Sequence, residues 1–225
     1  YITTLTSYAG PANLRNALIY SDNIYFAKAA LKIGSDKFIS SLKNLGFNEN
    51  IEFPQTISKS SYSNSEGFTN ETQLANSGYG QGEMLVSPIH MAMMYSAFVN
   101  EGNMIMPYIE YKENASSANA TYYKEGAFTK EAADTIRDDL IQVVENPGGT
   151  AHSAQIAGKT IAGKTGTAEV KASKDDTEGT EVGWFNAFTV NETDENSRLI
   201  ISMVENVKGK GGSHYLLPKV KAILE

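Results

Sequence analysis

The sequence predicts an α+β protein, because helical patterns fill the first part of the chain and strand patterns fill the last third. Residues 159–170, 182–190 and 198–205 are predicted strands, and the latter two are rich in β-branched and aromatic residues. Residues 192–196 supply a turn between the second and third strands. We therefore expect a helical cluster packed on an antiparallel sheet.

Three short helices are expected near the start of the chain. The first covers residues 11–19, and the second covers 24–33 and is closed by Gly34. Ser35 is the expected N-cap of a third helix, which ends at Gly46.

The middle of the chain alternates between irregular and helical patterns. Residues 47–70 are rich in Ser, Asn and Gly and predict an irregular segment, whereas residues 71–77 predict a helix. Three closely spaced glycines then predict a tight turn. They are Gly78, Gly80 and Gly82.

Three further helices have recognisable ends. Ser87-Pro88 opens a helix to about residue 100, and Thr129 is the expected cap of a long helix to about Asn146. Pro147-Gly148-Gly149 stops that helix, and a final helix covers about 215–225. With no internal repeat and no low-complexity segment, we expect residues 1–225 to form part of one domain.

The composition of the chain argues against several classes of function. The chain has 225 residues, 41% of them hydrophobic, and a formal net charge of −7. An acidic chain is a poor partner for nucleic acid, because phosphate binding needs clustered Lys and Arg. With no cysteine, and with scattered His90, His152 and His214, the sequence predicts no metal site. No apolar run approaches the ~20 residues of a membrane span.

Ser21-Asp22-Asn23 has residue types suited to acyl transfer. That reaction needs a nucleophile, a proton path to the leaving amine and donors for the developing oxyanion. The Ser21 hydroxyl, placed beside a lysine, could pass a proton to the leaving group. The Asn23 amide could hold a substrate peptide bond, since it offers both a donor and an acceptor.

A second motif, Lys164-Thr165-Gly166-Thr167, lies on the first predicted strand. The charge of Lys164 suits a substrate carboxylate and would tune the protonation of Ser21. Thr165 and Thr167 share one face of the strand, so both hydroxyls could bind that carboxylate. Gly166 leaves room for a neighbouring element to pack closely. At a sheet edge, this strand could pair with an extended peptide, and the Thr167 N–H could point at the oxyanion.

The two motifs resemble those of the transpeptidase domain of class B penicillin-binding proteins, the enzymes that cross-link peptidoglycan. The resemblance covers essentially the whole chain, and several segments look most like the low-affinity, methicillin-resistance-type branch from Gram-positive bacteria. The segments that carry it are 20–27, 77–83, Ser87-Pro88, 163–169 and Gly183-Trp184-Phe185. It implies a partial penicillin-binding transpeptidase fold, related to serine β-lactamases.

The resemblance also implies a role for each motif residue. Ser21 would be the proton relay and Asn23 the substrate amide binder, while Asp22 orients the loop. Lys164 to Thr167 match the motif on the strand that lines the active site, where Thr167 would supply one oxyanion N–H. The family needs no metal or organic cofactor.

In this family the nucleophile belongs to a Ser-x-x-Lys motif upstream of Ser21, and none of the 20 preceding residues forms one. We therefore expect the chain to be the C-terminal part of a larger D,D-transpeptidase, inactive without its N-terminal part. The resemblance implies peptidoglycan stem peptides and β-lactam antibiotics as ligands. It also implies an extracytoplasmic location, with an N-terminal anchor as the only link to the membrane.

Other interpretations of the motifs remain open. A serine β-lactamase or a β-lactam-sensing receptor would share some of them, although no deacylating Glu is identified here. Residues 158–165 also match the phosphate-loop pattern G-x-x-x-x-G-K-T, but the context of a strand followed by a helix is missing. Ser40 and Lys43 form a Ser-x-x-Lys that follows Ser21 and is expected on a solvated helix face.

Overall fold

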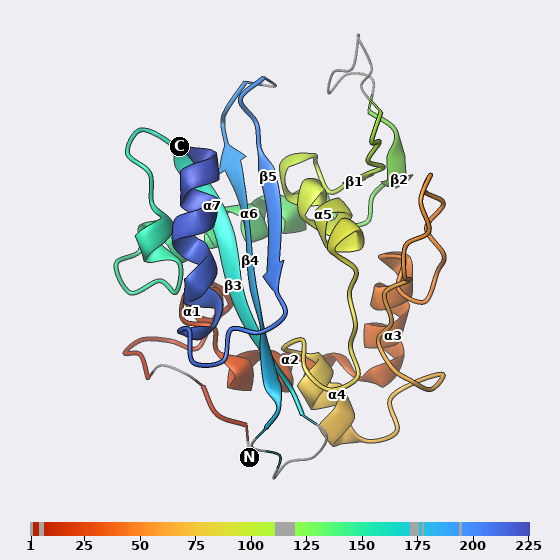
Figure 1. Cartoon of the computed structure of the whole chain (residues 1–225). Coiled ribbons are helices and arrows are strands. Elements are labelled where there is room, and N and C mark those ends of the chain that lie inside the picture. The colour runs from red at the N-terminus through yellow and green to blue at the C-terminus, as the bar shows by residue number, and fades with distance from the viewer. Residues whose placement is uncertain (1, 5–6, 111–119, 172–175, 177, 194) are drawn as a thin grey trace. The chain divides into compact units, whose positions relative to one another are not determined.

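The computed structural model in Figure 1 describes all residues except 1, 5–6, 111–119, 172–175, 177 and 194. The chain divides into two compact units, which are described separately. The first unit contains residues 1–25 and 138–225, and the second contains residues 26–137.

The first unit contains a three-stranded antiparallel sheet. Its strands are β3 (Thr160–Val170), β4 (Thr180–Val190) and β5 (Leu199–Val204), in the order β3-β4-β5. The predicted meander is confirmed, and each predicted strand end lies within two residues of the observed one. The predicted turn at 192–196 lies partly outside the described residues, as does the segment between β3 and β4.

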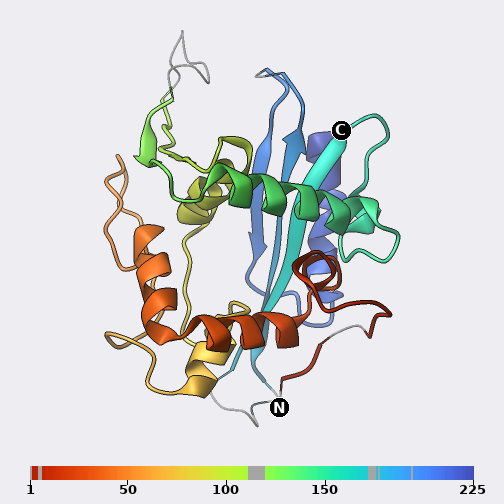
Figure 2. The same ribbon diagram turned by 180° about the vertical axis from the view of Figure 1, so that it is seen from behind.

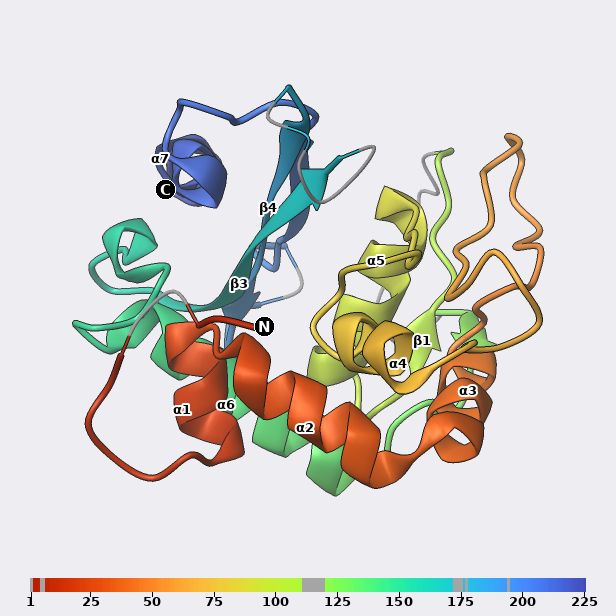
Figure 3. The same ribbon diagram turned by 90° about the horizontal axis from the view of Figure 1, so that it is seen from below.

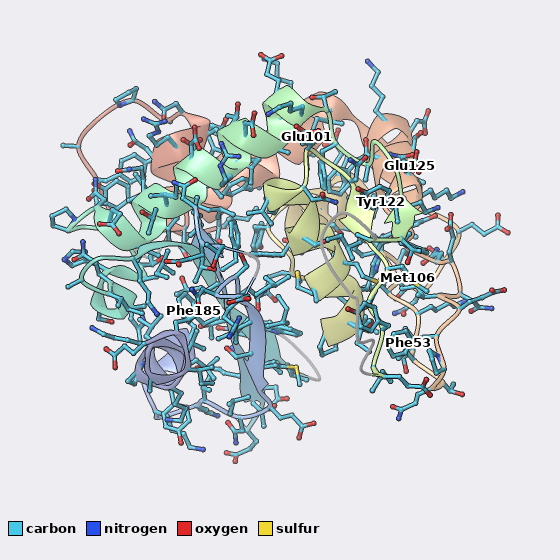
Figure 4. All side chains as sticks on the ribbon, turned by 90° about the horizontal axis from the view of Figure 1, so that it is seen from above. Phe53, Glu101, Met106, Tyr122, Glu125 and Phe185 are labelled. Atoms are coloured by element: carbon cyan, nitrogen blue, oxygen red, sulfur yellow. The ribbon has the colours of Figure 1, made fainter. Side chains whose placement is uncertain are left out.

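The C-terminal helix covers one face of this sheet (Figure 1). The chain passes through a 3-10 turn, η4 (Gly212–Leu216), into α7 (Leu217–Leu224). Leu217 and Val220 of α7 are fully buried, as is Phe185 of β4. Figure 4 shows Phe185 beside α7. Burial of this apolar face stabilises the unit, because each large side chain removed from water contributes about 1.5–3 kcal/mol.

Helices α1 (Leu14–Tyr20) and α6 (Lys130–Glu145) and the 3-10 turn η3 (His152–Ala154) contribute further residues to this unit. α6 runs without a break (Figure 2), and the Thr129 hydroxyl accepts a hydrogen bond from the Ala132 N–H, as the predicted cap requires. Arg15 of α1 pairs with the buried carboxylate of Asp139 on α6 at 2.6 Å. This charge pair joins the two helices.

The second unit is mainly helical. Its elements are most of α2 (Asn23–Ile33), α3 (Ser35–Asn44), α4 (Glu71–Ser77), α5 (Pro88–Ser96), the 3-10 turn η1 (Ala97–Val99), and the short strands β1 (Met104–Ile105) and β2 (Tyr122–Lys124). Among the described residues, no helix is both long enough and apolar enough to cross a membrane.

Most predicted helix ends in this unit are confirmed. The Ser87 hydroxyl caps α5 by accepting from the His90 N–H, and Gly80 and Gly82 have the positive φ angles of a tight turn. The predicted cap at Ser35 is wrong. The N-cap of α3 is Gly34, which has φ 83° and no side chain to form a capping hydrogen bond. The cap falls on this residue because the same glycine both ends α2 and begins α3.

The hairpin of β1 and β2 is absent from the sequence prediction. Its two strands hold only two and three residues, which is too few for a period-2 pattern to emerge. One further backbone bond extends the pairing of β1 with β2, because the Met106 N–H donates to the Thr121 carbonyl. Figure 4 shows Met106 and Tyr122 in the same part of the second unit.

His90 lies at the centre of the second unit with no exposed surface. Its Nε2 donates to the Leu45 carbonyl at 2.8 Å, so Nδ1 accepts from the Ser60 hydroxyl at 2.7 Å. The Ser60 oxygen in turn accepts from the Ser87 N–H. In this neutral tautomer both ring nitrogens have a partner, and burial of the ring lowers the pKa of His90 below its usual value.

We expect this histidine to make the protein less stable in acid. The unfolded chain protonates His90 near pH 6.5, whereas the folded chain does so only at lower pH, so its stabilising contribution is complete above pH 6.5 and falls as the pH drops. The slope is at most about 1.4 kcal/mol per pH unit. Urea unfolding at pH 7.5 and 5.5 measures it. His90→Gln should flatten this dependence, and His214→Gln, at an exposed position, should leave it intact.

Candidate active site

Ser21 lies in the turn between α1 and α2, where the chain changes direction (Figure 3). Its N–H donates to the Leu18 carbonyl at 3.4 Å, and the Asp22 N–H donates to the Ala17 carbonyl at 2.9 Å. This is the Schellman pattern that ends many helices. Ser21 has φ 55° and ψ 54°, the left-handed conformation that the pattern requires. The backbone therefore fixes where the Ser21 hydroxyl lies.

Asp22 holds the start of α2. Its Oδ1 accepts from the Ile24 and Tyr25 N–H groups at 2.9 and 3.2 Å, and its Oδ2 accepts from the Tyr8 hydroxyl at 2.9 Å. A carboxylate at a helix start also interacts favourably with the helix dipole. Both carboxylate oxygens accept hydrogen bonds from the protein itself, which fits the expectation that Asp22 orients the loop.

Asn23 is half-buried, and its side-chain amide binds a backbone carbonyl. The Nδ2 group donates to the Thr3 carbonyl at 3.2 Å. A peptide substrate presents the same kind of acceptor. The geometry therefore places at Asn23 a donor that can bind an extended backbone.

Lys164 joins the two sequence motifs. Its Nζ donates to Ser21 Oγ at 2.8 Å and to the Thr165 carbonyl at 2.8 Å, so residues 143 positions apart are in contact. The residue is half-buried, and desolvation of its ammonium group lowers the pKa of Lys164 from 10.5 to about 8. A lysine tuned in this way can change its charge close to neutral pH.

Asn186 is the cross-strand neighbour of Lys164 on β4. The residue is 4% exposed, and its side-chain oxygen has no hydrogen-bond partner within the described part of the chain. Directly opposed residues of antiparallel strands lie on the same face, so the Asn186 amide shares the Lys164 face of the sheet. The sequence prediction did not include this residue.

Thr165 and Thr167 share the other face of β3, as predicted. Thr165 Oγ1 donates to Thr150 Oγ1 at 2.8 Å, and Thr167 Oγ1 accepts from the Ser213 N–H at 3.1 Å. The turn after α6, through Thr150, and η4, through Ser213, therefore orient the two hydroxyls. In the described residues β3 pairs with a strand on one side only, as expected for an edge that binds an extended peptide.

The close packing expected at Gly166 is found at Gly163 instead. A Cβ atom at Gly166 would meet only the Trp184 Cβ at 3.6 Å, an ordinary contact. At Gly163 it would lie 3.0 Å from both the Asn186 carbonyl oxygen and a Phe185 ring carbon. The sequence prediction for Gly166 was wrong on this point, because spacing alone does not show which glycine faces a bulky neighbour.

A family model described as "Penicillin binding protein transpeptidase domain" matches residues 1–225. The chain belongs to this family. Its sequence is 42% identical over 220 residues to penicillin-binding protein 3 of Bacillus subtilis, covering 98% of this chain and 32% of that protein. It is also 25% identical over 177 residues to peptidoglycan D,D-transpeptidase MrdA of Acinetobacter baumannii, covering 72% of this chain and 26% of that protein.

A solved structure has the same fold. Penicillin-binding protein A from Mycobacterium tuberculosis superposes with a TM-score of 0.72 at 18% identity, over 96% of this chain and 50% of that chain. The predicted α+β penicillin-binding transpeptidase fold is confirmed, and so is the resemblance to class B transpeptidase domains. This transpeptidase chain spans about a third of the Bacillus protein and half of the mycobacterial chain.

The phosphate-loop pattern of this transpeptidase chain forms no phosphate loop. From Thr160 onward its residues belong to β3, and Lys164 lies inside that strand, which leads into β4. A phosphate loop needs helix N–H groups at this point, so the nucleotide-binding alternative is wrong. Ser40 and Lys43 are exposed on α3, as expected for a solvated face.

Besides Asn186, two further residues at this transpeptidase site escaped the sequence prediction. The sequence analysis assigned no role to Thr150, which directly follows the stop after α6, and none to Ser213. Both act through contacts between segments far apart in the chain, which periodicity does not encode. The glycines before each of them, Gly148-Gly149 and Gly211-Gly212, were the available signal for a close backbone approach.

Proposed function

We propose that this chain is the C-terminal part of a peptidoglycan D,D-transpeptidase domain that reacts through a serine acyl-enzyme. The contact between Lys164 Nζ and Ser21 Oγ, at 2.8 Å, carries the proposal. It brings together the two motifs that acyl transfer to and from an amide would use. The relatives described above are penicillin-binding proteins, which favours this function over a β-lactamase or a β-lactam sensor.

Each motif residue has a role in the proposed reaction. Ser21 relays a proton to the leaving amine, and Asn23 binds a substrate amide. Lys164 supplies positive charge for the substrate carboxylate and tunes Ser21. Thr165, Gly166 and Thr167 line the bound peptide along the β3 edge, and the Thr167 N–H is one oxyanion donor.

The nucleophile of the proposed reaction is a serine in a Ser-x-x-Lys motif N-terminal to Tyr1. Its hydroxyl oxygen attacks the penultimate D-alanine carbonyl of a stem peptide and gives up its proton to the lysine of that motif. The amide bond to the last D-alanine breaks as Ser21 delivers a proton to that amine and takes one up from the neighbouring lysines in exchange. An amine of a second peptide then attacks the ester, which restores the serine hydroxyl. A β-lactam acylates the same serine in this proposal. Penicillin-binding protein A of Mycobacterium tuberculosis forms an acyl-enzyme complex with penicillin G, which supports this part of the proposal.

The setting of the proposed enzyme follows from its substrate. Peptidoglycan is built outside the cytoplasm, so the domain acts on the extracytoplasmic face of the bacterial membrane, anchored by an N-terminal segment. Its partners are stem peptides, β-lactams and the N-terminal part of the same protein. The reaction uses no metal or organic cofactor.

The intact mass of the full-length protein, measured after incubation with penicillin G, tests this function. We expect a single covalent adduct, and peptide mapping should place it on a serine N-terminal to Tyr1. An unmodified protein, or an adduct on Ser40, would contradict the proposal. The chain 1–225 alone, treated in parallel, should stay unmodified.

A further inference from the structure

The turn after α6 contacts both halves of the proposed site. The Thr150 N–H donates to the Ile19 carbonyl at 3.1 Å, two residues before Ser21. The Thr150 hydroxyl oxygen accepts from the Thr165 hydroxyl at 2.8 Å, one residue after Lys164. One residue therefore reaches both motifs, and all of these residues lie in the first unit.

These contacts close a ring of hydrogen bonds. Lys164 Nζ bonds to Ser21 Oγ and to the Thr165 carbonyl, Thr165 bonds to Thr150, and Thr150 bonds to Ile19, from which the backbone leads back to Ser21. In such a ring two connections fix the distance from Lys164 to Ser21. One is their direct hydrogen bond, and the other runs through Thr165, Thr150 and Ile19. The Lys164 side chain alone has four rotatable bonds and would hold that distance poorly.

The turn that carries Thr150 is itself held by α6. The Gly148 N–H donates to Asn146 Oδ1 at 2.9 Å, and the Gly149 N–H donates to the Asn146 carbonyl at 2.8 Å. A Cβ atom at Gly149 would collide with the Val143 carbonyl oxygen of α6. The turn thus lies against the helix end too closely for a side chain, which fixes the position of the next residue, Thr150.

The same turn contacts the residue before Ser21. A Cβ atom at Gly148 would lie 3.0 Å from a ring carbon of Tyr20. The Tyr20 ring stacks on the Tyr8 ring, with the two ring centroids 4.6 Å apart. The Tyr8 hydroxyl in turn donates a hydrogen bond to Asp22. The turn therefore also packs against the segment that presents Ser21.

We propose that Thr150 is a positioning residue of the acyl-transfer site, which holds the Lys164 segment of β3 in place against the Ser21 turn. It acts through Thr165 and Ile19 and touches no reacting atom. The inference rests on the proposed function, because its consequence is a change in acylation rate.

The test compares two substitutions in the full-length protein. Thr150→Val keeps the shape and the N–H bond to Ile19 but removes the hydroxyl, whereas Thr150→Ser keeps the hydroxyl. We expect the second-order rate of acylation by a fluorescent penicillin to fall about tenfold in Thr150→Val, as for the loss of one buried hydrogen bond. Thr150→Ser should restore most of the rate.

Two controls separate positioning from general damage. Thr160→Val makes the same exchange on β3 and should leave the rate unchanged, because no bond links Thr160 to this ring. In a double-mutant cycle, Thr150→Val should add little to Thr165→Val, since both remove the same bond. A thermal unfolding scan of each variant checks that it is folded.

The outcomes distinguish this inference from the proposed function. A wild-type rate in Thr150→Val, an equal loss in Thr150→Ser, or additive effects with Thr165→Val would overturn the positioning role and leave the transpeptidase proposal intact. A wild-type protein that penicillin does not acylate would overturn the proposed function and this inference with it.

Discussion

Replacing Lys164 with alanine in the full-length protein should slow acylation by penicillin by about two to three orders of magnitude. Losses of this size follow the removal of one group that stabilises developing charge or moves a proton. Lys164 is placed for both tasks, since its Nζ lies 2.8 Å from Ser21 Oγ in a partly desolvated position. The second-order rate of acylation by a fluorescent penicillin measures the effect.

The chain offers a matched control for this substitution. Lys159 follows a glycine and precedes a threonine, as Lys164 does, but its Nζ binds the Leu224 carbonyl at the end of α7. Lys159→Ala should therefore acylate at nearly the wild-type rate. Equal losses in both variants would assign the effect to folding, and a wild-type rate in Lys164→Ala would remove Lys164 from the mechanism.

The pH dependence of acylation should report the same lysine. Burial lowers the pKa of Lys164 to about 8, so the residue is cationic below that pH and neutral above it. If its charge attracts the carboxylate of the antibiotic, the acylation rate falls as the pH rises through 8. In Lys164→Arg the fall should disappear from this range, because a guanidinium keeps its charge to beyond pH ~12. A fall that persists in this variant would have another origin.

Replacing Gly102 with alanine should destabilise the second unit by about 3 kcal/mol. Gly102 has φ 89°, and its Cβ atom would collide with the Phe128 carbonyl oxygen. The left-handed conformation costs a non-glycine residue about 1 kcal/mol, and forced overpacking adds roughly 2 kcal/mol. The backbone has little freedom to relax, because the Gly102 carbonyl accepts from the Phe128 N–H and its N–H donates to the Ala97 carbonyl.

Gly126 provides the control for this prediction. It also has a positive φ, 59°, but no atom lies within 4 Å of the position of its Cβ. Gly126→Ala should therefore cost only the backbone term, about 1 kcal/mol. Urea unfolding of both variants gives the difference, and equal losses would show that the contact with Phe128 is relieved by local movement.

The sequence predicted most elements because local chemistry decides them. The caps at Ser87 and Thr129 and the β-branched strands from Thr180 and Leu199 act through neighbouring residues, and all four were found as expected. The cap at Ser35 failed because a local rule favours serine, whereas the turn between two abutting helices required the positive φ of Gly34.

The site was only partly predictable. Ser21 and Lys164 could be paired from a family pattern, and the structure brings them into contact. The contacts of Thr150 with Ile19 and Thr165 could not be foreseen, since they join three segments distant in sequence and leave no periodic signal. Sequence spacing identified the groups suited to the chemistry, but it could not identify the groups that hold them in place.

At the left-handed turn of Ser21, the residue that would be best for stability differs from the residue that the reaction needs. A glycine there would relieve roughly 1 kcal/mol of backbone strain, yet it would remove the hydroxyl that Lys164 binds. Random mutation selected for thermal stability alone should therefore drift toward glycine or asparagine at this position. Retention of serine would mark selection for activity, so the residue at position 21 can serve as a simple indicator of whether a variant or a relative still carries out the reaction.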